Sequence, residues 1–380
     1  MKIIKFSFQD NLHQWQLDPI EFKGFNLLVG VSGVGKTQIL SSLRTTVDIA
    51  KGHEFNGISW SISFSTDNDK TYKWSGEFET LINEQSDGFE EDLYGLSRKP
   101  KIKKERLESS GEVIIDRRGS KITLCDNTIP ILCPHQSALY LLRYEPRVSP
   151  ASLAFEQVIN SDTVKTVQNT YLYHIHTVTD VIKKFNTLEK IQATKFNTLV
   201  KLSLLNHCSP DFFEEIKEEF IGIFPQVEDI KIETSQQNFE DKTLITHNLL
   251  LKEKGIRGWV DQARISSGMY KTFLQLAQMH LWPRNSVIIV DEFENSLGIN
   301  CIDALTDAIM SHPGDLQFII TSHHPYIINN ISPDHWKVVQ RRFDRVTTSD
   351  AKSLGLGKSN HEAFIQLINN DKYIDGISSQ

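Results

Sequence analysis

The spacing of apolar residues predicts strands at the start of the chain. Apolar and polar residues alternate around Phe6 and Phe8, and again at 58–64, where the sequence is ISWSISF. A period of two is typical of strands with one buried face. Turns are predicted at 67–69 and at Arg118-Gly119, so residues 58 to 125 are expected to form a mostly antiparallel lobe.

A strand, a glycine loop and a helix are predicted next to one another near the N-terminus. The run FNLLV at 25–29 is wholly apolar and ends at Gly30. Between 36 and 50, Ile39 and Leu43 recur at the spacing of one helix face. The pattern therefore predicts a buried strand that leads into a glycine loop at the start of a helix.

Residues 150–226 are predicted to form a helical insertion, because the alternation stops and apolar residues take helical spacing. The pentapeptide KFNTL occurs twice there, at 184–188 and 195–199. An offset of eleven residues is close to three helical turns, so Phe185 and Phe196 are expected on one face of a helix. Coincidence on an amphipathic helix explains the repeat as well as a function does.

The last part of the chain is predicted to alternate strands and helices. The runs SVIIV at 286–290 and QFII at 317–320 are short and fully apolar, as in central parallel strands covered on both faces. We expect an α/β fold with three parts, which are an N-terminal lobe (1–149), the helical insertion (150–226) and a C-terminal lobe (227–380).

Composition sets only broad limits. Hydrophobic residues make up 39% and charged residues 23% of the 380 residues, an ordinary globular balance. The four cysteines lack CxxC spacing, which argues against disulfides and a zinc site. No leader peptide or membrane span is predicted, so a cytoplasmic protein without membrane partners is expected. The net charge of -7 argues against bulk attraction to DNA and leaves a local basic patch open.

The loop GVSGVGKT matches the phosphate-binding P-loop, and the strand before it and the helix after it are the context that this motif needs. Backbone N–H groups cradle phosphates in such a loop, while the lysine reaches the terminal phosphates and the threonine hydroxyl binds magnesium. We therefore expect ATP and Mg²⁺ as ligands. The predicted binding residues are Gly30, Ser32, Gly33, Val34, Gly35, Lys36 and Thr37.

An acidic pair, Asp291 and Glu292, directly follows the apolar strand at 286–290. Carboxylates at the carboxyl end of a buried parallel strand lie in the crevice where ligands bind. Asp291 is therefore predicted to hold Mg²⁺, and Glu292 to polarise the attacking water.

A serine- and glycine-rich segment precedes this pair. The sequence RISSGMYK at 264–271 places Ser266, Ser267 and Gly268 at a predicted helix start. Serine there caps the helix or contributes to a second anion-binding site, and the order of motifs along the chain favours the second interpretation.

Two short motifs follow the acidic pair. NSLG stands at 295–298, and TSHHP at 321–325 comes after the next apolar strand. A histidine at a strand end is suited to sense a terminal phosphate, and this position distinguishes His323 and His324 from the other histidines.

In this order, the motifs resemble those of the ABC-type ATPases, and in particular the SMC, RecF and OLD-like ATPases found in many prokaryotic phage-defence systems. The resemblance spans residues 30–325, nearly the whole chain. It implies that residues 266–268 bind the nucleotide held by a second copy, so that two ATP molecules lie between two heads. It also implies Glu292 as catalytic base and His323 as switch histidine. Gln136 matches the Q-loop glutamine, although helix capping or solvent exposure explains this residue equally well.

Several features depart from the relatives. Met269 stands where transporters have glutamine, and Gly298 where many D-loops have aspartate, which leaves communication between heads open. Ser267 follows Lys36 by 231 residues, too few for the coiled-coil arms of SMC proteins. The 55 residues after Pro325 are too few for the TOPRIM nuclease domain of OLD-like proteins, so any nuclease is expected on another chain.

We expect an ATPase that pairs with another copy of itself around ATP and acts as a sensor or scaffold in anti-phage defence. Its expected partner is a separately encoded effector such as a TOPRIM or HNH nuclease, with DNA or a phage component as a further candidate partner. The alternative is a RecF-like repair ATPase that binds DNA directly. A transporter ATPase fits poorly, because no membrane span is predicted.

Two further candidates are weaker. The basic run RKPKIKK at 98–104 could contact nucleic-acid phosphates, although a solvated loop beside the acidic residues 90–92 explains it as well. His174 and His176 have no readable third ligand nearby, so no metal site is expected there.

Overall fold

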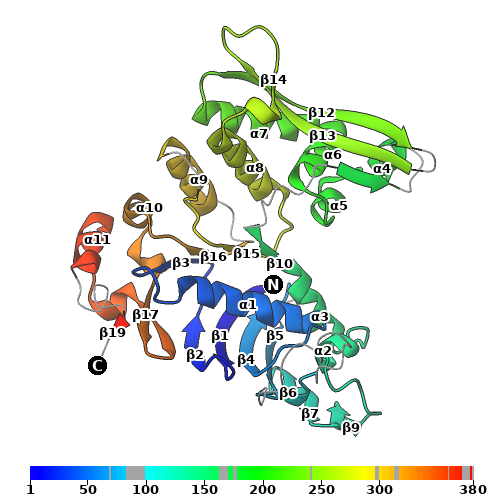
Figure 1. Ribbon diagram of the computed structural model, residues 1–380, viewed down its shortest axis with the longest axis vertical. Helices are drawn as coiled ribbons and strands as arrows, with labels where there is room; N and C mark the ends of the chain where they lie inside the picture. The colour runs from blue at the N-terminus through cyan, green and yellow to red at the C-terminus, as the bar shows by residue number, and fades with distance from the viewer. Residues whose placement is uncertain are drawn as a thin grey trace, which may run out of the picture. The chain divides into compact units, whose positions relative to one another are not determined.

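A computed structural model describes residues 1–67, 70–82, 99–161, 170–173, 178–239, 242–295, 299–311, 316–357, 359–369 and 377–378. The chain divides into two units, coloured by residue number in Figure 1. The first unit contains Met1–Ser161, Asn285–Phe293 and Gly314–Gln380, and the second contains Asp162–Arg284 and Glu294–Pro313.

One sheet of 15 strands runs through the described part of the first unit. Its strands are β1 (Lys2–Asp10), β2 (Trp15–Glu21), β3 (Phe25–Val29), β4 (Ile58–Ser65), β5 (Thr71–Phe78), β6 (Ile102–Ser109), β7 (Glu112–Arg118), β8 (Lys121–Leu124), β9 (Asn127–Thr128), β10 (Val158–Asn160), β15 (Val287–Val290), β16 (Gln317–Thr321), β17 (Trp336–Arg342), β18 (Arg345–Asp350) and β19 (Ile377–Ser378). Its helices are α1 (Lys36–Ala50), α2 (Ala138–Leu141), α3 (Ser149–Ala154), α10 (Pro325–Asn330) and α11 (Asn360–Ile368).

The sheet has a parallel half and an antiparallel half. Strands β10, β15, β16, β3 and β17 lie side by side in this order and are parallel. Strands β2, β1 and β4–β9 are antiparallel neighbours, and β18 joins the halves by pairing with β17 and β2. The predicted α/β fold with an antiparallel lobe is confirmed.

The core follows from the two hydrophobic patterns. Every residue of β3, β15 and β16 is buried, as expected of uninterrupted apolar runs. On β4 the buried residues alternate with half-buried serines, so only one face of the antiparallel half is apolar. The apolar side of α1, with Ile39 and Leu43, packs into the same core as Phe6 and Ile62. In Figure 1, α1 lies across the strands of this unit.

The second unit combines a small sheet with helices. Its strands are β11 (Thr170–Tyr173), β12 (Val227–Phe239), β13 (Lys242–Glu253) and β14 (Val260–Asp261), and its helices are α4 (Val178–Lys184), α5 (Leu188–Gln192), α6 (Thr198–Cys208), α7 (Pro210–Ile223), α8 (Ser267–Leu281) and α9 (Ile299–Ser311). Strand β13 pairs with β11 and β12, and α6 and α7 pack against α8. Residues 227–284 therefore group with the insertion helices.

Two short strands replace helix in the stretch predicted to be helical. Strand β10 joins the main sheet beside β15, and β11 pairs with β13. Strands of three and four residues are too short for their period to be recognised. Only their partners, more than 70 residues away in sequence, determine that they form.

The prediction of one continuous helix through the KFNTL repeat was also wrong. Three helices, α4, α5 and α6, occupy this stretch. Thr187 caps α5 and Asn197 caps α6, because their side chains accept the N–H groups of Lys190 and Val200. The repeat is thus a pair of helix-start signals. The rings of Phe185 and Phe196 still meet, with their centroids 5.3 Å apart.

Within the described residues, no helix combines the length and the apolar character that crossing a membrane requires.

Candidate nucleotide-binding site

Glycines shape the loop between β3 and α1. Gly33 and Gly35 have φ values of +86° and +105°, which residues with a side chain rarely adopt. A Cβ atom on Gly30 would lie 2.8 Å from the carbonyl oxygen of Val339, and one on Gly35 would lie 2.9 Å from Cγ2 of Val346. The hairpin of β17 and β18 therefore packs directly on the loop, and only glycine fits at these two positions.

Lys36 lies at the mouth of this loop, in the first turn of α1. Its Nζ donates hydrogen bonds to the carbonyl oxygens of Gly30 (2.6 Å) and Val31 (3.0 Å). No residue in the first turn of α1 is itself acidic, so the helix does not offset the positive end of its own dipole. A helix start with a lysine and inward N–H groups attracts phosphate.

Three strand ends bring the polar residues of the site together. Strands β3, β16 and β15 are parallel neighbours, so their carboxyl ends lie at one edge of the sheet. The hydroxyl Oγ1 of Thr37 donates to Oδ1 of Asp291 at 3.2 Å, although the two residues are 254 positions apart in sequence. The hydroxyl of Thr321, at the end of β16, donates to the same carboxylate oxygen at 2.6 Å.

Glu292 has an unusual backbone conformation. Its φ is +49°, in the left-handed region, which a residue with a side chain occupies at a cost. Its N–H donates to Oγ1 of Thr321 at 2.8 Å. The Glu292 side chain is exposed, whereas Thr321 is 1% exposed. The fold therefore holds the acid predicted to be the base at the surface of the site, on a strained turn after β15.

The residues present fit a nucleoside triphosphate with magnesium. Hydroxyl and carboxylate oxygens are the ligands that Mg²⁺ prefers, and Thr37 and Asp291 supply one of each within hydrogen-bond distance. The glycine loop and the start of α1 are shaped to receive phosphate oxygens. This donor set agrees with the chemistry expected from the sequence.

The serine-glycine segment starts α8 in the second unit. Ser266 caps the helix, since its Oγ accepts the N–H of Met269 at 3.3 Å. Both Ser266 and Ser267 are exposed, and Gly268 is half-buried. The capping interpretation thus accounts for the Ser266 hydroxyl in this chain. Ser267 is exposed, and within the described residues its side chain caps no N–H group of the helix start.

The structure does not bring Gln136 to the P-loop. Its Nε2 donates to the carbonyl oxygen of Gly52 at 3.3 Å, just beyond the end of α1, and its own carbonyl accepts from Arg117 at 2.8 Å. Helix α1 has 15 residues and spans about 22 Å at 1.5 Å per residue. Gln136 is therefore held at the end of α1 opposite the loop.

The two histidines follow β16 directly. His323 is exposed, and His324 is half-buried with its ring 6.4 Å from that of Tyr326. Within the described residues, Nδ1 of His324 has no hydrogen-bond partner. Of the NSLG motif only Asn295 is described, and residues 296–298 lie outside the described residues, as do Arg98, His174 and His176.

Sequence reasoning missed two residues at this edge of the sheet. Thr321 was treated as part of a motif named for its histidines, although its hydroxyl bonds both acidic residues. Asn160 ends β10 and pairs in register with Ile289 of β15, two positions before Asp291. A polar residue at a strand end was the available signal in both cases, but β10 itself was not predicted.

Comparison with known proteins finds one family match, which begins after the P-loop. Residues 167–329 match the family described as "AAA domain, putative AbiEii toxin, Type IV TA system". The chain resembles the AAA-type ATPases. This match and the parallel strand core with its P-loop agree with the class predicted from the order of motifs. Comparison with curated proteins finds no match.

The solved structures that match include three SMC heads. The structure titled "Crystal structure of the SmcHead bound to the C-winged helix domain of ScpA" is 14% identical, covers 94% of this chain and 100% of that chain, and has a TM-score of 0.46. The "SMC head domain from Thermotoga maritima" is 10% identical over 92% and 99% of the chains, with a TM-score of 0.43. An Smc head domain from Pyrococcus furiosus is 12% identical over 93% and 98%, with a TM-score of 0.44.

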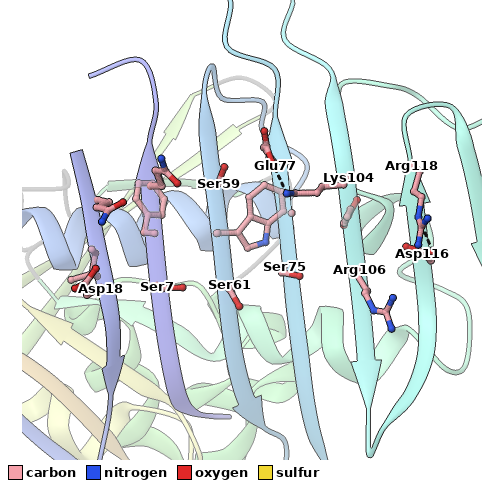
Figure 2. A pocket seen from close by; sticks show the side chains of 17 residues that line it. Ser7, Asp18, Ser59, Ser61, Ser75, Glu77, Lys104, Arg106, Asp116 and Arg118 are labelled. Carbon is pink, nitrogen blue, oxygen red and sulfur yellow. Dashed lines mark ion pairs between the residues drawn. The ribbon is translucent and has the colours of Figure 1, made fainter. Parts of the chain in front are cut away.

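A hollow of about 650 Å³ lies on the polar face of the antiparallel strands, shown in Figure 2. Its floor is made of short side chains, because Ser7, Ser61 and Ser75 stand opposite one another on β1, β4 and β5. Ion pairs across its wall are Glu77–Lys104 (2.8 Å) and Asp116–Arg118 (3.4 Å). These charges neutralise one another. The lining contains no P-loop residue, so this hollow is separate from the candidate nucleotide-binding site.

The basic run is partly neutralised where it is described, because two carboxylates pair with three of its lysines. Lys99 pairs with Glu54 at 2.7 Å, and Lys103 and Lys104 both pair with Glu77, at 3.1 Å and 2.8 Å. Such exposed pairs contribute little stability, but they reduce the positive charge available to nucleic acid.

Proposed function

We propose that this chain binds ATP with magnesium at its P-loop and hydrolyses it. The convergence of Thr37 and Asp291, 3.2 Å apart from distant parts of the sequence, carries this proposal. Lys36 and the loop N–H groups bind the phosphates, and Thr37 and Asp291 hold the metal. Bound Mg²⁺ supplies positive charge to the phosphates. Glu292 orients and polarises a water, and His323 contacts the terminal phosphate.

The ATPase is proposed to work as a pair of heads. In this arrangement Ser266, Ser267 and Gly268 of one copy bind the nucleotide held by the other. The exposure of Ser266 and Ser267 and the lack of acidic residues in the first turn of α8 support this role, because both favour contact with phosphate. The motif order along the chain supports it as well.

The cellular role that we propose is an ATP-dependent sensor or scaffold in prokaryotic defence, which controls a separately encoded effector such as a nuclease. The description of the matched family names an AbiEii toxin and a Type IV toxin–antitoxin system, which supports a role in defence. The paired lysines of the basic run favour control of a protein partner over direct gripping of DNA.

Two assays on the purified chain test this proposal. We expect phosphate release from ATP that requires Mg²⁺ and no retardation of a DNA duplex in a gel-shift titration, with or without ATP. Tight duplex binding would instead support a RecF-like repair ATPase. Absence of both nucleotide binding and phosphate release would contradict the ATPase proposal itself.

A further inference from the structure

The hydroxyl of Thr321 is bonded to both acidic residues that follow β15. It donates to Oδ1 of Asp291 at 2.6 Å and accepts the backbone N–H of Glu292 at 2.8 Å. A threonine hydroxyl has one hydrogen to donate, and here Asp291 receives it. With 1% exposure, Thr321 has little water nearby to replace either bond.

These two bonds support a strained backbone at Glu292 and a carboxylate oxygen of Asp291 that accepts more than one hydrogen bond. Glu292 holds a φ of +49°, so its turn needs support from its surroundings. The same Asp291 oxygen also accepts the hydroxyl of Thr37, which links the start of α1 to the end of β15. One side chain on β16 thus fixes both the direction of the Asp291 carboxylate and the backbone that carries Glu292.

We propose that Thr321 is a positioning residue for ATP hydrolysis, which acts through Asp291 and Glu292 and does not itself touch the nucleotide. This inference rests on the proposed ATPase function. Thr321 lies two positions before His323, so a displacement of the strand end that carries the histidine also moves the hydroxyl. The switch segment and the acidic pair are therefore mechanically connected through this residue.

A purely structural role for Thr321 predicts a different outcome from a positioning role. If the residue only fills space in the core, valine replaces it with nearly the same shape, whereas serine leaves a small cavity. If its hydroxyl positions the acids, serine keeps the function and valine loses it. The two substitutions thus separate packing from hydrogen bonding at one site.

The experiment compares Thr321→Val, Thr321→Ser and wild type, with Thr306→Val as matched control. Thr306 is a buried threonine whose hydroxyl has no hydrogen-bond partner among the described residues, so its replacement removes no such bond. For each protein, kcat and KM for ATP are measured, together with the Mg²⁺ concentration that half-saturates ATP-dependent thermal stabilisation.

We expect Thr321→Val to lower kcat about tenfold or more, to change KM by less than about threefold, and to raise the Mg²⁺ requirement several-fold. Thr321→Ser and Thr306→Val should remain within about threefold of wild type. If Thr321→Val does not fold, Thr321→Cys replaces it, because cysteine is close in volume to threonine but its thiol donates only weakly.

Unchanged kcat and Mg²⁺ dependence in Thr321→Val would overturn the inference, as would equal losses in the valine and serine variants. In either case wild type still binds and hydrolyses ATP. Failure of wild type to bind ATP at all would mark the different case in which the proposed function itself fails.

Discussion

The P-loop region of the first unit and the serine-glycine helix start of the second unit are built differently. In the first, Thr37 and Thr321 both donate to the carboxylate of Asp291, beside the ends of buried parallel strands. In the second, Ser266 accepts a backbone N–H of its own helix, and Ser267 beside it is exposed. The first region is assembled within one chain, whereas the second is an exposed helix start, for which we propose a phosphate-binding role in contact with another copy.

The difference shows what each region requires. A site whose polar groups bond one another is held in shape by the core around it, so its residues should be sensitive to single substitutions. A helix start on the surface tolerates substitution in the isolated chain, and its contribution should appear only when copies associate.

Replacement of Lys36 by alanine should weaken ATP binding about 100-fold, or about 2.7 kcal/mol, because the charged contact to the phosphates is lost. Titration with a fluorescent ATP analogue measures the Kd. Lys51→Ala, just past the other end of α1, is the control and should bind as wild type does. An unchanged Kd in Lys36→Ala would remove the P-loop from the binding site.

The second unit should lose stability in mild acid through His247. Burial, with a smaller effect from the charge of His207, lowers the pKa of His247 to about 4 from 6.5. Between these values the unfolded chain binds the proton and the folded chain does not, so stability rises with pH and is lost as pH falls from 6.5 towards 4. The expected loss at pH 5 is about 2 kcal/mol.

Denaturant unfolding at pH 7.5 and pH 5, followed by a probe in the second unit, measures this loss. His247→Gln keeps a polar side chain that does not titrate, so its stability should change less over the same range. Equal losses in wild type and His247→Gln would show that His247 is not responsible.

A bulky charged side chain at the start of α8 should weaken the association of copies and leave ATP binding by a single copy unchanged. Ser267→Arg is expected to leave the Kd for ATP within about twofold of wild type and to weaken ATP-dependent association about tenfold, or about 1.4 kcal/mol. Analytical ultracentrifugation with and without ATP measures the association. Weakened ATP binding by the monomer, with association intact, would contradict the division of roles between the two regions.

The smallest expected effect concerns the KFNTL repeat. Asn197→Ala removes the cap of α6 and should cost about 1 kcal/mol of stability, since the N–H of Val200 loses its acceptor. Thermal unfolding measures this cost, and ATP turnover should stay unchanged. Asn186→Ala, at the equivalent asparagine of the first copy, is the control, because Thr187 and not Asn186 caps α5.

The parallel half of the fold was predictable because its signals are local. Fully apolar runs that stop at Gly30 or at Asp291 predict buried strands that lead into the candidate site. The alternation in β4 predicts a half-buried strand. The contact between Thr37 and Asp291 then follows from parallel strands ending at one edge.

The remaining features depend on contacts that spacing does not reveal. Strands β10 and β11 form because of distant partners, and Gln136 is drawn to Gly52 by a network around the buried Arg117. Thr321 was overlooked because its neighbour His323 has the more recognisable chemistry. Tertiary contacts, and not local propensity, determine where β10, β11 and Gln136 lie.

In the arrangement that we propose, two copies of this chain hold two ATP molecules between them, and Glu292 is needed for hydrolysis but not for binding. Native mass spectrometry of Glu292→Gln incubated with ATP and Mg²⁺ tests it most directly, since slow turnover preserves the bound state. We expect a species of two chains with two ATP molecules. A single chain with ATP still bound, or a protein without nucleotide, would contradict the account.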